Sequence, residues 1–186
     1  LRIALGGATL DQVFAAARTG FRSGGGSFGL FTPALSPGEE ATTDVALYGL
    51  AADAANRTNV AVVHSGPDGS GPITLEIRAY DGDAAGAQRG APIQQALEPG
   101  QHAQVNLILG TVGIRNGWVR VRRVSGAAPW LAYGVVNDGG VPGERTGDGS
   151  YVSMEVPVPA PAPPGTIGPA GGTVSLADGS ASLVVP

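Results

Sequence analysis

The stretch Gly117–Asp138, GWVRVRRVSGAAPWLAYGVVND, decides the predicted fold. Two runs rich in β-branched and aromatic residues flank a short loop of small residues, which is typical of two strands joined by a turn. Side chains alternate along a strand, and opposed residues of an antiparallel pair point the same way. Pairing the two runs as a hairpin predicts a buried face with Val119, Val121, Leu131, Tyr133 and Val135, and an outer face with Trp118, Arg120, Arg122, Trp130, Ala132 and Gly134.

Arg123 is the residue that breaks this alternation, because it falls on the predicted buried face. A charged side chain is rarely buried without a partner. We therefore expect Arg123 at the margin of the sheet or at a β-bulge.

The composition of the 186 residues indicates an all-β protein with many turns. Apolar residues make up 42%, enough for a core, whereas 31 glycines and 15 prolines interrupt the apolar runs throughout. The net charge of −4 gives no basic balance for nucleic acid, which is not an expected partner. No apolar run approaches the roughly 20 residues of a membrane span.

The absence of cysteine excludes disulfides, thiolate metal sites and cysteine nucleophiles. All 11 basic residues are arginine, and with the bias toward Ala, Gly and Pro this indicates a high-GC bacterial genome.

Further strands are expected at the close, regular spacing of a sandwich. The clearest alternation lies in Ile73–Tyr80, where Ile73, Leu75, Ile77 and Ala79 share one face and Thr74, Glu76, Arg78 and Tyr80 share the other. The other predicted strands are Asp44–Tyr48, Thr58–His64, Pro92–Ala96, Gln101–Val105 and Ser150–Val156, with one helical turn within Asn106–Val112.

The first 35 residues resemble a shortened copy of the chain's later part. The segment DQVFAAARTGF is ambiguous by itself, because its alanines and the possible cap Asp11 favour a helix. The repeat favours strand, and predicts a hairpin over Leu1–Arg18 with Leu1, Ile3 and Phe14 buried. The aligned triplets are Leu1-Arg2-Ile3 with Val119-Arg120-Val121, Val13-Phe14-Ala15 with Trp130-Leu131-Ala132, and Gly26-Ser27-Phe28 with Gly149-Ser150-Tyr151.

Four segments follow from these patterns. Residues 1–35 are expected to be the C-terminal hairpin and last strand of a preceding module, and 36–156 a complete β-sandwich module. Alternating proline makes 157–165 a semi-rigid linker. Residues 166–186 are predicted to form two short strands around Ala177-Asp178-Gly179. Since the pattern runs on at both ends, we expect a fragment of a longer protein.

Five groups of residues recur in this order in a known kind of module: Asn56-Arg57-Thr58-Asn59-Val60, the turn after Ile73–Tyr80, Gly117-Trp118-Val119, Ala132-Tyr133-Gly134-Val135-Val136-Asn137-Asp138 and Thr146-Gly147-Asp148. Through them, residues 40–155 resemble a tandem β-sandwich module of large secreted and surface proteins of high-GC bacteria. The resemblance implies an immunoglobulin-like antiparallel sandwich without catalytic residues to carry over.

The terminal segment contains Ile167-Gly168-Pro169-Ala170-Gly171-Gly172-Thr173-Val174, then Asp178-Gly179 and an apolar run that ends at Pro186. With these residues, 166–186 resemble the opening hairpin of the zona-occludens and netrin-receptor type sandwich domain, which in bacteria also occurs in extracellular multidomain chains.

Three patterns suggest chemistry, and each has a simpler interpretation. Gly24–Gly29, GGGSFG, matches both a dinucleotide-binding loop and a nucleophile elbow around Ser27. Both motifs need a helix directly after them, whereas Leu30-Phe31-Thr32-Pro33 predicts a strand. Asp81-Gly82-Asp83 could suggest calcium, yet Asp-Gly between strands is a turn signal. His64 and His102 have no pairing that would hold zinc, and we expect strand-end or surface histidines.

Trp118, Arg120, Arg122 and Trp130 form the candidate ligand face. Arginines on an outer sheet face are most simply a solvated surface that discourages edge-to-edge pairing. Guanidinium groups beside indole rings also suit carbohydrate or carboxylate ligands. Both interpretations remain open at this point.

These observations predict a non-catalytic spacer module of an extracellular or cell-surface bacterial protein, with no cofactor. Its expected partners are neighbouring domains of the same polypeptide. The alternative is an adhesion module that binds surface carbohydrate or protein, and an enzyme fragment is the weaker third alternative. A binding module should display a contiguous exposed aromatic patch, and a spacer should not.

Overall fold

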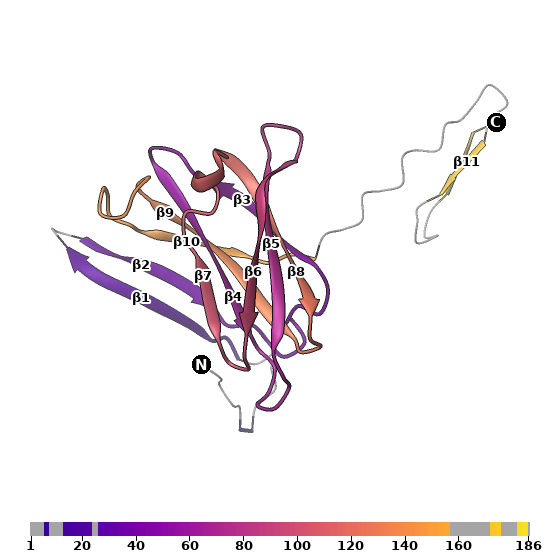
Figure 1. Cartoon of the computed structure of the whole chain (residues 1–186), viewed down its shortest axis with the longest axis horizontal. Helices are drawn as coiled ribbons and strands as arrows, with labels where there is room; N and C mark the ends of the chain where they lie inside the picture. The colour runs from indigo at the N-terminus through magenta and orange to yellow at the C-terminus, as the bar shows by residue number, and fades with distance from the viewer. Residues whose placement is uncertain (1–5, 8–12, 24–25, 157–171, 176–181, 186) are drawn as a thin grey trace. The chain divides into compact units, whose positions relative to one another are not determined.

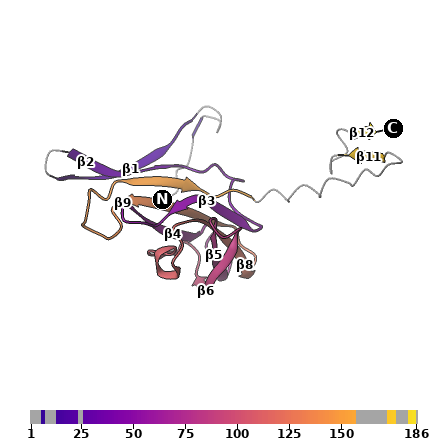
Figure 2. The same cartoon turned by 90° about the horizontal axis from the view of Figure 1, so that it is seen from above.

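The computed structural model describes residues 6–7, 13–23, 26–156, 172–175 and 182–185. The chain divides into two units, Leu1–Val156 and Pro157–Pro186. The first unit is an all-β sandwich of two sheets, which Figure 1 shows from its broad side and Figure 2 from above. The predicted all-β, largely antiparallel sandwich is therefore confirmed.

The sheets of the first unit differ in size. The larger contains, in spatial order, β1 (Ala16–Ser23), β2 (Gly26–Pro33), β10 (Gly149–Ser153), β9 (Trp130–Asp138), β4 (Asn56–His64) and β7 (His102–Val105). The smaller contains β3 (Val45–Ala51), β8 (Asn116–Ser125), β5 (Ile73–Asp81) and β6 (Ala87–Leu97). Neighbouring strands are antiparallel except β2 and β10, where Leu30 pairs with Gly149 in parallel.

The core lies between these sheets. The four apolar residues predicted to share one face of Ile73–Tyr80 are all buried, as expected from their alternation. The predicted helical turn is present as the 3-10 helix Gly110–Val112, and Ile108 and Leu109 just before it are buried. The remaining large core residues are Val45, Leu47, Leu50, Val60, Val62, Leu97, Ile114, Val119, Val121 and Trp130.

The hairpin predicted over Gly117–Asp138 is wrong. β8 pairs with β3 and β5, whereas β9 pairs with β4 and β10, so residues 126–129 cross from one sheet to the other. The two strands therefore lie in opposite sheets instead of side by side in one sheet. Both direct their inward residues at the core, which places Trp130 and Ala132 opposite the sheet that carries Val119 and Val121.

This crossing reverses the predicted faces of β9 and leaves those of β8 intact. Val119 and Val121 are buried and Arg120 is exposed, as predicted. In contrast, Trp130 is 0% exposed, and Leu131 and Tyr133 are only half-buried on the outer side.

Arg123 lies at a bulge, as predicted. Thr74 pairs with Ser125 but Leu75 pairs with Arg123, so β8 carries one extra residue there. The Arg123 guanidinium donates to the carbonyl oxygens of Ala127 and Ala128, at 2.9 and 2.6 Å. The charge is thus accommodated by backbone acceptors at the end of the sheet.

The N-terminal prediction is confirmed only in part. Residues 16–18 are strand and not helix, but residues 1–5 and 8–12 of the predicted hairpin lie outside the described residues. The described hairpin is β1–β2. Phe14 was predicted to be buried and is 79% exposed, stacked on the exposed Phe31 with ring centroids 6.5 Å apart. This hairpin contacts the sandwich through β10, and Phe14 has no facing sheet to cover it.

The second unit contains β11 (Gly172–Ser175) and β12 (Ser182–Val185), paired antiparallel. This matches the two predicted strands, whereas their turn and the proline-rich segment 157–165 lie outside the described residues. In the described part of the chain, no helix has the length and apolar character required to cross a membrane.

Candidate functional site

The outer face of the smaller sheet collects the candidate ligand residues. β5 and β8 are neighbours there, and three successive cross-strand pairs point away from the core: Glu76 with Arg122, Arg78 with Arg120, and Tyr80 with Trp118. They share a face because each pair is two residues from the next along both strands.

Three aromatic rings form a contiguous row at one end of this face. Tyr80 and Trp118 are stacked with centroids 4.0 Å apart and planes at 7°. Tyr48 lies 5.7 Å from Trp118 on the other side and is 43% exposed. A register shift between Leu47 and Leu50 in β3 accompanies the outward position of Tyr48. Such cross-strand pairs stabilise the sheet, and the row also leaves aromatic surface accessible to solvent.

Charged groups occupy the middle of the same face. The Glu76 Oε1 atom accepts hydrogen bonds from Nε of Arg78 and Nε of Arg122, each at 2.7 Å. Arg120 forms an ion pair with Asp44 through Nη2. The hydrogen bond from Arg78, followed by that from Arg122, holds the pKa of Glu76 below its ordinary value although desolvation opposes this.

Between these groups lies a shallow hollow of about 100 Å³, lined by Glu76, Arg78, Tyr80, Arg120 and Arg122. Three arginines face two carboxylates here, so the face carries a net positive charge on a chain whose net charge is −4. The arrangement can bind an anionic group through guanidinium N–H donors.

The structure thus brings together three of the four predicted ligand-face residues. Trp118, Arg120 and Arg122 lie on one face, but Trp130 is in the core because β9 belongs to the other sheet. Sequence reasoning missed Tyr48, Glu76, Arg78 and Tyr80 as site residues. The outward face of Ile73–Tyr80 was predicted, but nothing in the pattern paired that strand with Trp118–Arg122.

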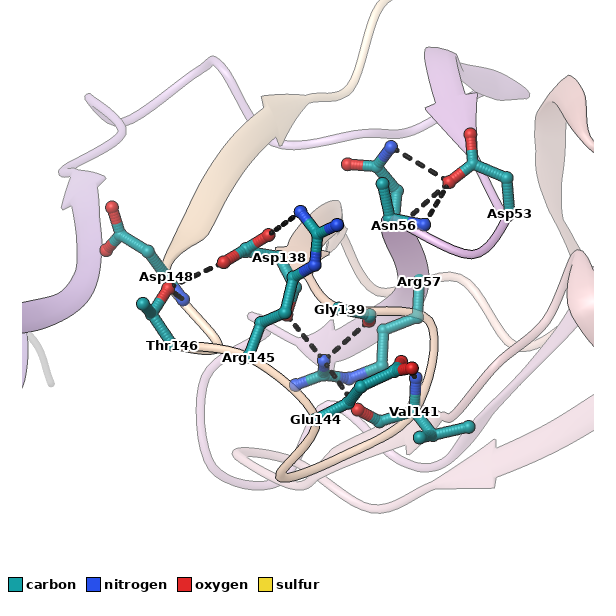
Figure 3. Close-up of polar contacts among 11 residues, drawn as sticks. Asp53, Asn56, Arg57, Asp138, Gly139, Val141, Glu144, Arg145, Thr146 and Asp148 are labelled. Carbon is teal, nitrogen blue, oxygen red and sulfur yellow. Dashed lines mark hydrogen bonds and ion pairs between the residues drawn. The ribbon is translucent and has the colours of Figure 1, made fainter.

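A second polar cluster lies at the end of β4 and β9 (Figure 3). Nη1 of Arg57 donates to the carbonyl oxygens of Asp138 and Gly139, each at 2.8 Å. The Asp138 carboxylate accepts from the Thr146 hydroxyl at 2.8 Å and from Arg145 at 3.4 Å. The Thr146 bond is the main reason that the pKa of Asp138 is lowered.

Asp148 connects this cluster to the N-terminal hairpin. Its backbone N–H donates to Thr146 Oγ1 at 3.2 Å, and its Oδ1 accepts from the backbone N–H of Gly29 at 2.8 Å. We call Arg57, Asp138, Thr146 and Asp148 the clasp. All four belong to the residues that carry the resemblance to tandem modules. Here they hold the loop together, and Asp148 binds β2.

The two histidines make structural contacts. His64 is 1% exposed; its Nδ1 accepts from the Gly66 N–H at 3.1 Å, which leaves Nε2 to donate to the Gly71 carbonyl at 2.9 Å. His102 is exposed, with Nε2 3.5 Å from the Tyr133 hydroxyl. Neither contacts a carboxylate within the described ranges.

The other two patterns are also structural. Residues 26–29 of the glycine-rich stretch begin strand β2, which continues to Pro33 and is not followed there by a helix, and residues 24–25 lie outside the described residues. Asp81 accepts from the Asp83 N–H and pairs with Arg89, as in a turn. Among the residues that the structure describes, no three acidic or histidine side chains gather in a way that could hold a metal ion.

Comparison with known proteins found no match to any family model, curated protein or solved structure.

Proposed function

We propose that this chain is a non-catalytic structural module, immunoglobulin-like in architecture, of a secreted or cell-surface bacterial multidomain protein. Its role is to carry neighbouring domains of the same polypeptide at a defined spacing. One observation carries this proposal: β2 continues the sheet of the sandwich at β10, and the clasp residue Asp148 binds the backbone of β2.

The strand arrangement of the hairpin supports a tandem origin. β1 and β2 form an antiparallel pair, as do β9 and β10. The sequence repeat aligns Gly26 with Gly149, and each is the first residue of the second strand of its pair. A hairpin derived from a preceding copy would therefore extend this module's sheet without a separate interface.

Measurement of backbone hydrogen exchange by NMR tests the connection. Asp148→Ala removes the acceptor for the Gly29 N–H, so we expect the Gly29 amide and its neighbours in β2 to exchange up to about tenfold faster, as for one lost hydrogen bond to a charged group. Exchange in β4 and β5 should stay unchanged, because these strands lie in the sandwich.

Two control variants sharpen this experiment. Asp148→Asn keeps a side-chain carbonyl oxygen and should retain most of the protection. Glu144→Ala removes an exposed carboxylate from the same loop that does not contact β2. Equal exchange of β2 in Asp148→Ala and Glu144→Ala would refute the role of the clasp.

A second candidate function is adhesion through the outer face of the smaller sheet. It is favoured by the contiguous row of Tyr48, Trp118 and Tyr80, since such a row distinguishes a binding module from a spacer. Under this proposal the face binds surface carbohydrate, and Trp118→Ala should abolish retention on the saccharide matrix that retains the wild-type chain.

A further inference from the structure

Arg78 and Arg120 are directly opposite each other in the middle of the outer face. Like charges in this position destabilise a sheet. Glu76 bonds to the Nε atoms of Arg78 and Arg122, and Asp44 bonds to Arg120, so three guanidinium groups share two carboxylates. An anion in the hollow between the arginines would neutralise the positive charge that remains.

The arginines also retain donors for such an anion. In the described part of the chain, Arg122 uses only its Nε in a hydrogen bond, and its side chain is 43% exposed. The Arg120 side chain is 44% exposed; one Nη atom bonds to Asp44, and the group also hydrogen-bonds to Tyr80. Arg78 donates from Nε to Glu76 and from Nη1 to Gln88, which leaves its other Nη atom as a donor. Guanidinium groups present paired N–H donors that match the two oxygens of a carboxylate. The hollow, at about 100 Å³, is large enough for a carboxylate but not for a whole ligand.

The remainder of the ligand must therefore lie outside the hollow, and the adjacent surface is aromatic. Tyr80 lines the hollow, and the stacked Trp118 and then Tyr48 continue the row away from it. Tyrosine and tryptophan combine an apolar ring with a polar atom, which suits a ligand that is part apolar and part hydroxylated.

The position of the hollow disfavours an extended peptide. Peptides that add to a sheet need a free strand edge. Here β5 is paired on both sides with β6 and β8, and β8 is paired with β3 and β5. A ligand at this place lies on the face of the sheet, where the ring of a sugar can contact the aromatic row.

We infer that this face binds an acidic saccharide, with a sugar carboxylate in the hollow between Arg78, Arg120 and Arg122 and the sugar ring against Tyr80 and Trp118. This inference rests on the adhesion role proposed above as the second candidate function. It specifies the ligand class of that role as uronic-acid glycans.

Isothermal titration of the whole chain with trigalacturonate tests the inference. Arg120→Gln removes one charged donor, and we expect a Kd about tenfold higher, as for the loss of one charge-assisted hydrogen bond. Arg18→Gln removes the same charge from an exposed position in β1 and should leave the Kd unchanged. Added salt should weaken binding by the wild type, because the contact is ionic and partly exposed.

Further ligands separate failure of the ligand class from failure of the adhesion role. If neutral galactotriose binds as tightly as trigalacturonate and Arg120→Gln has no effect, adhesion stands and the acidic class is refuted. Tighter binding of oligoglutamate or of acetate than of trigalacturonate would refute the saccharide. If no saccharide binds, both the inference and the adhesion role fall. A urea midpoint equal to that of the wild type shows that Arg120→Gln is folded.

Discussion

Substitution of the two tryptophans tests the crossing between the sheets most directly. Trp130 is 0% exposed in the core, and its Nε1 has no hydrogen-bond partner among the described residues, whereas Trp118 is half-buried on the outer face. A buried tryptophan removes about 200 Å² from water, which at about 25 cal/mol per Å² is about 5 kcal/mol. Because alanine keeps part of this burial, Trp130→Ala should lower the free energy of unfolding by about 3–5 kcal/mol.

Trp118→Ala should cost much less. It removes the stack on Tyr80 and the contact with Tyr48, and cross-strand aromatic pairs of this kind contribute about 1 kcal/mol. Trp130→Phe should cost less than Trp130→Ala, because phenylalanine keeps most of the apolar contact and removes the unpaired N–H.

Urea unfolding followed by circular dichroism measures these free energies, and fluorescence gives an independent measurement. Trp118→Phe leaves only Trp130, whose emission should be blue-shifted and resistant to acrylamide quenching. Trp130→Phe leaves only Trp118, which should be quenched more strongly. If Trp118→Ala destabilised as much as Trp130→Ala, or if Trp130 were the more readily quenched, the hairpin on one sheet would be right and the crossing wrong.

The remaining predictions concern the outer face and two loops. In the folded chain the pKa of Glu76 lies below its ordinary value of 4.5. The ionised Glu76 therefore stabilises the fold above pH 4.5, and this stabilisation is lost as the pH falls through the folded-state pKa. Urea unfolding at several pH values measures it, and Glu76→Gln should remove the part of the acid destabilisation that Glu76 causes. Gly126 has φ of 79°, and a Cβ there would lie 2.4 Å from the Pro72 carbonyl oxygen, so Gly126→Ala should destabilise by about 2 kcal/mol or more. Thermal melts of both variants measure this, and Gly110→Ala, where nothing lies within 4 Å of the added Cβ, should be almost neutral in them. His64→Ala removes the acceptor of the Gly66 N–H and the donor to the Gly71 carbonyl and should cost about 2–5 kcal/mol by urea unfolding. A loss below about 1 kcal/mol would show that the ring does not hold this loop.

Alternation within single strands could be predicted from the sequence. The inward residues of Ile73–Tyr80 and of Val119–Val121 are where the pattern places them. This works because neighbouring side chains of a strand must point to opposite faces whatever the strand pairs with. The positions of the strands follow for the same reason, since glycine- and proline-rich turns separate the apolar runs.

The pairing of strands could not be predicted in this way, and the site depended on it. Glu76 and Arg78 are far from Arg120 and Arg122 in sequence, and only the β5–β8 pairing brings them to one hollow. Asp148 and Gly29 are likewise joined by the parallel contact of β2 with β10. Long-range pairing is decided by the packing of the whole sandwich, and the alternation within a strand does not specify it.

One wrong assumption explains why the predicted burial of both Trp130 and Leu131 is incorrect. In a hairpin on one sheet, the small loop 126–129 would return β9 beside β8 and give opposed residues the same face. In a crossing between sheets, β9 lies in the sheet opposite to that of β8, and the residues that point inward are the other set. Pro129 is the local signal for the second arrangement, because it has no N–H to continue a ladder with β8. Trp130 instead exchanges backbone hydrogen bonds with Ala41 at 2.8 and 3.1 Å and pairs with His64 of β4 in the larger sheet. The periodicity of a strand therefore determines which residues share a face, and the sheet that the strand joins determines which face is buried.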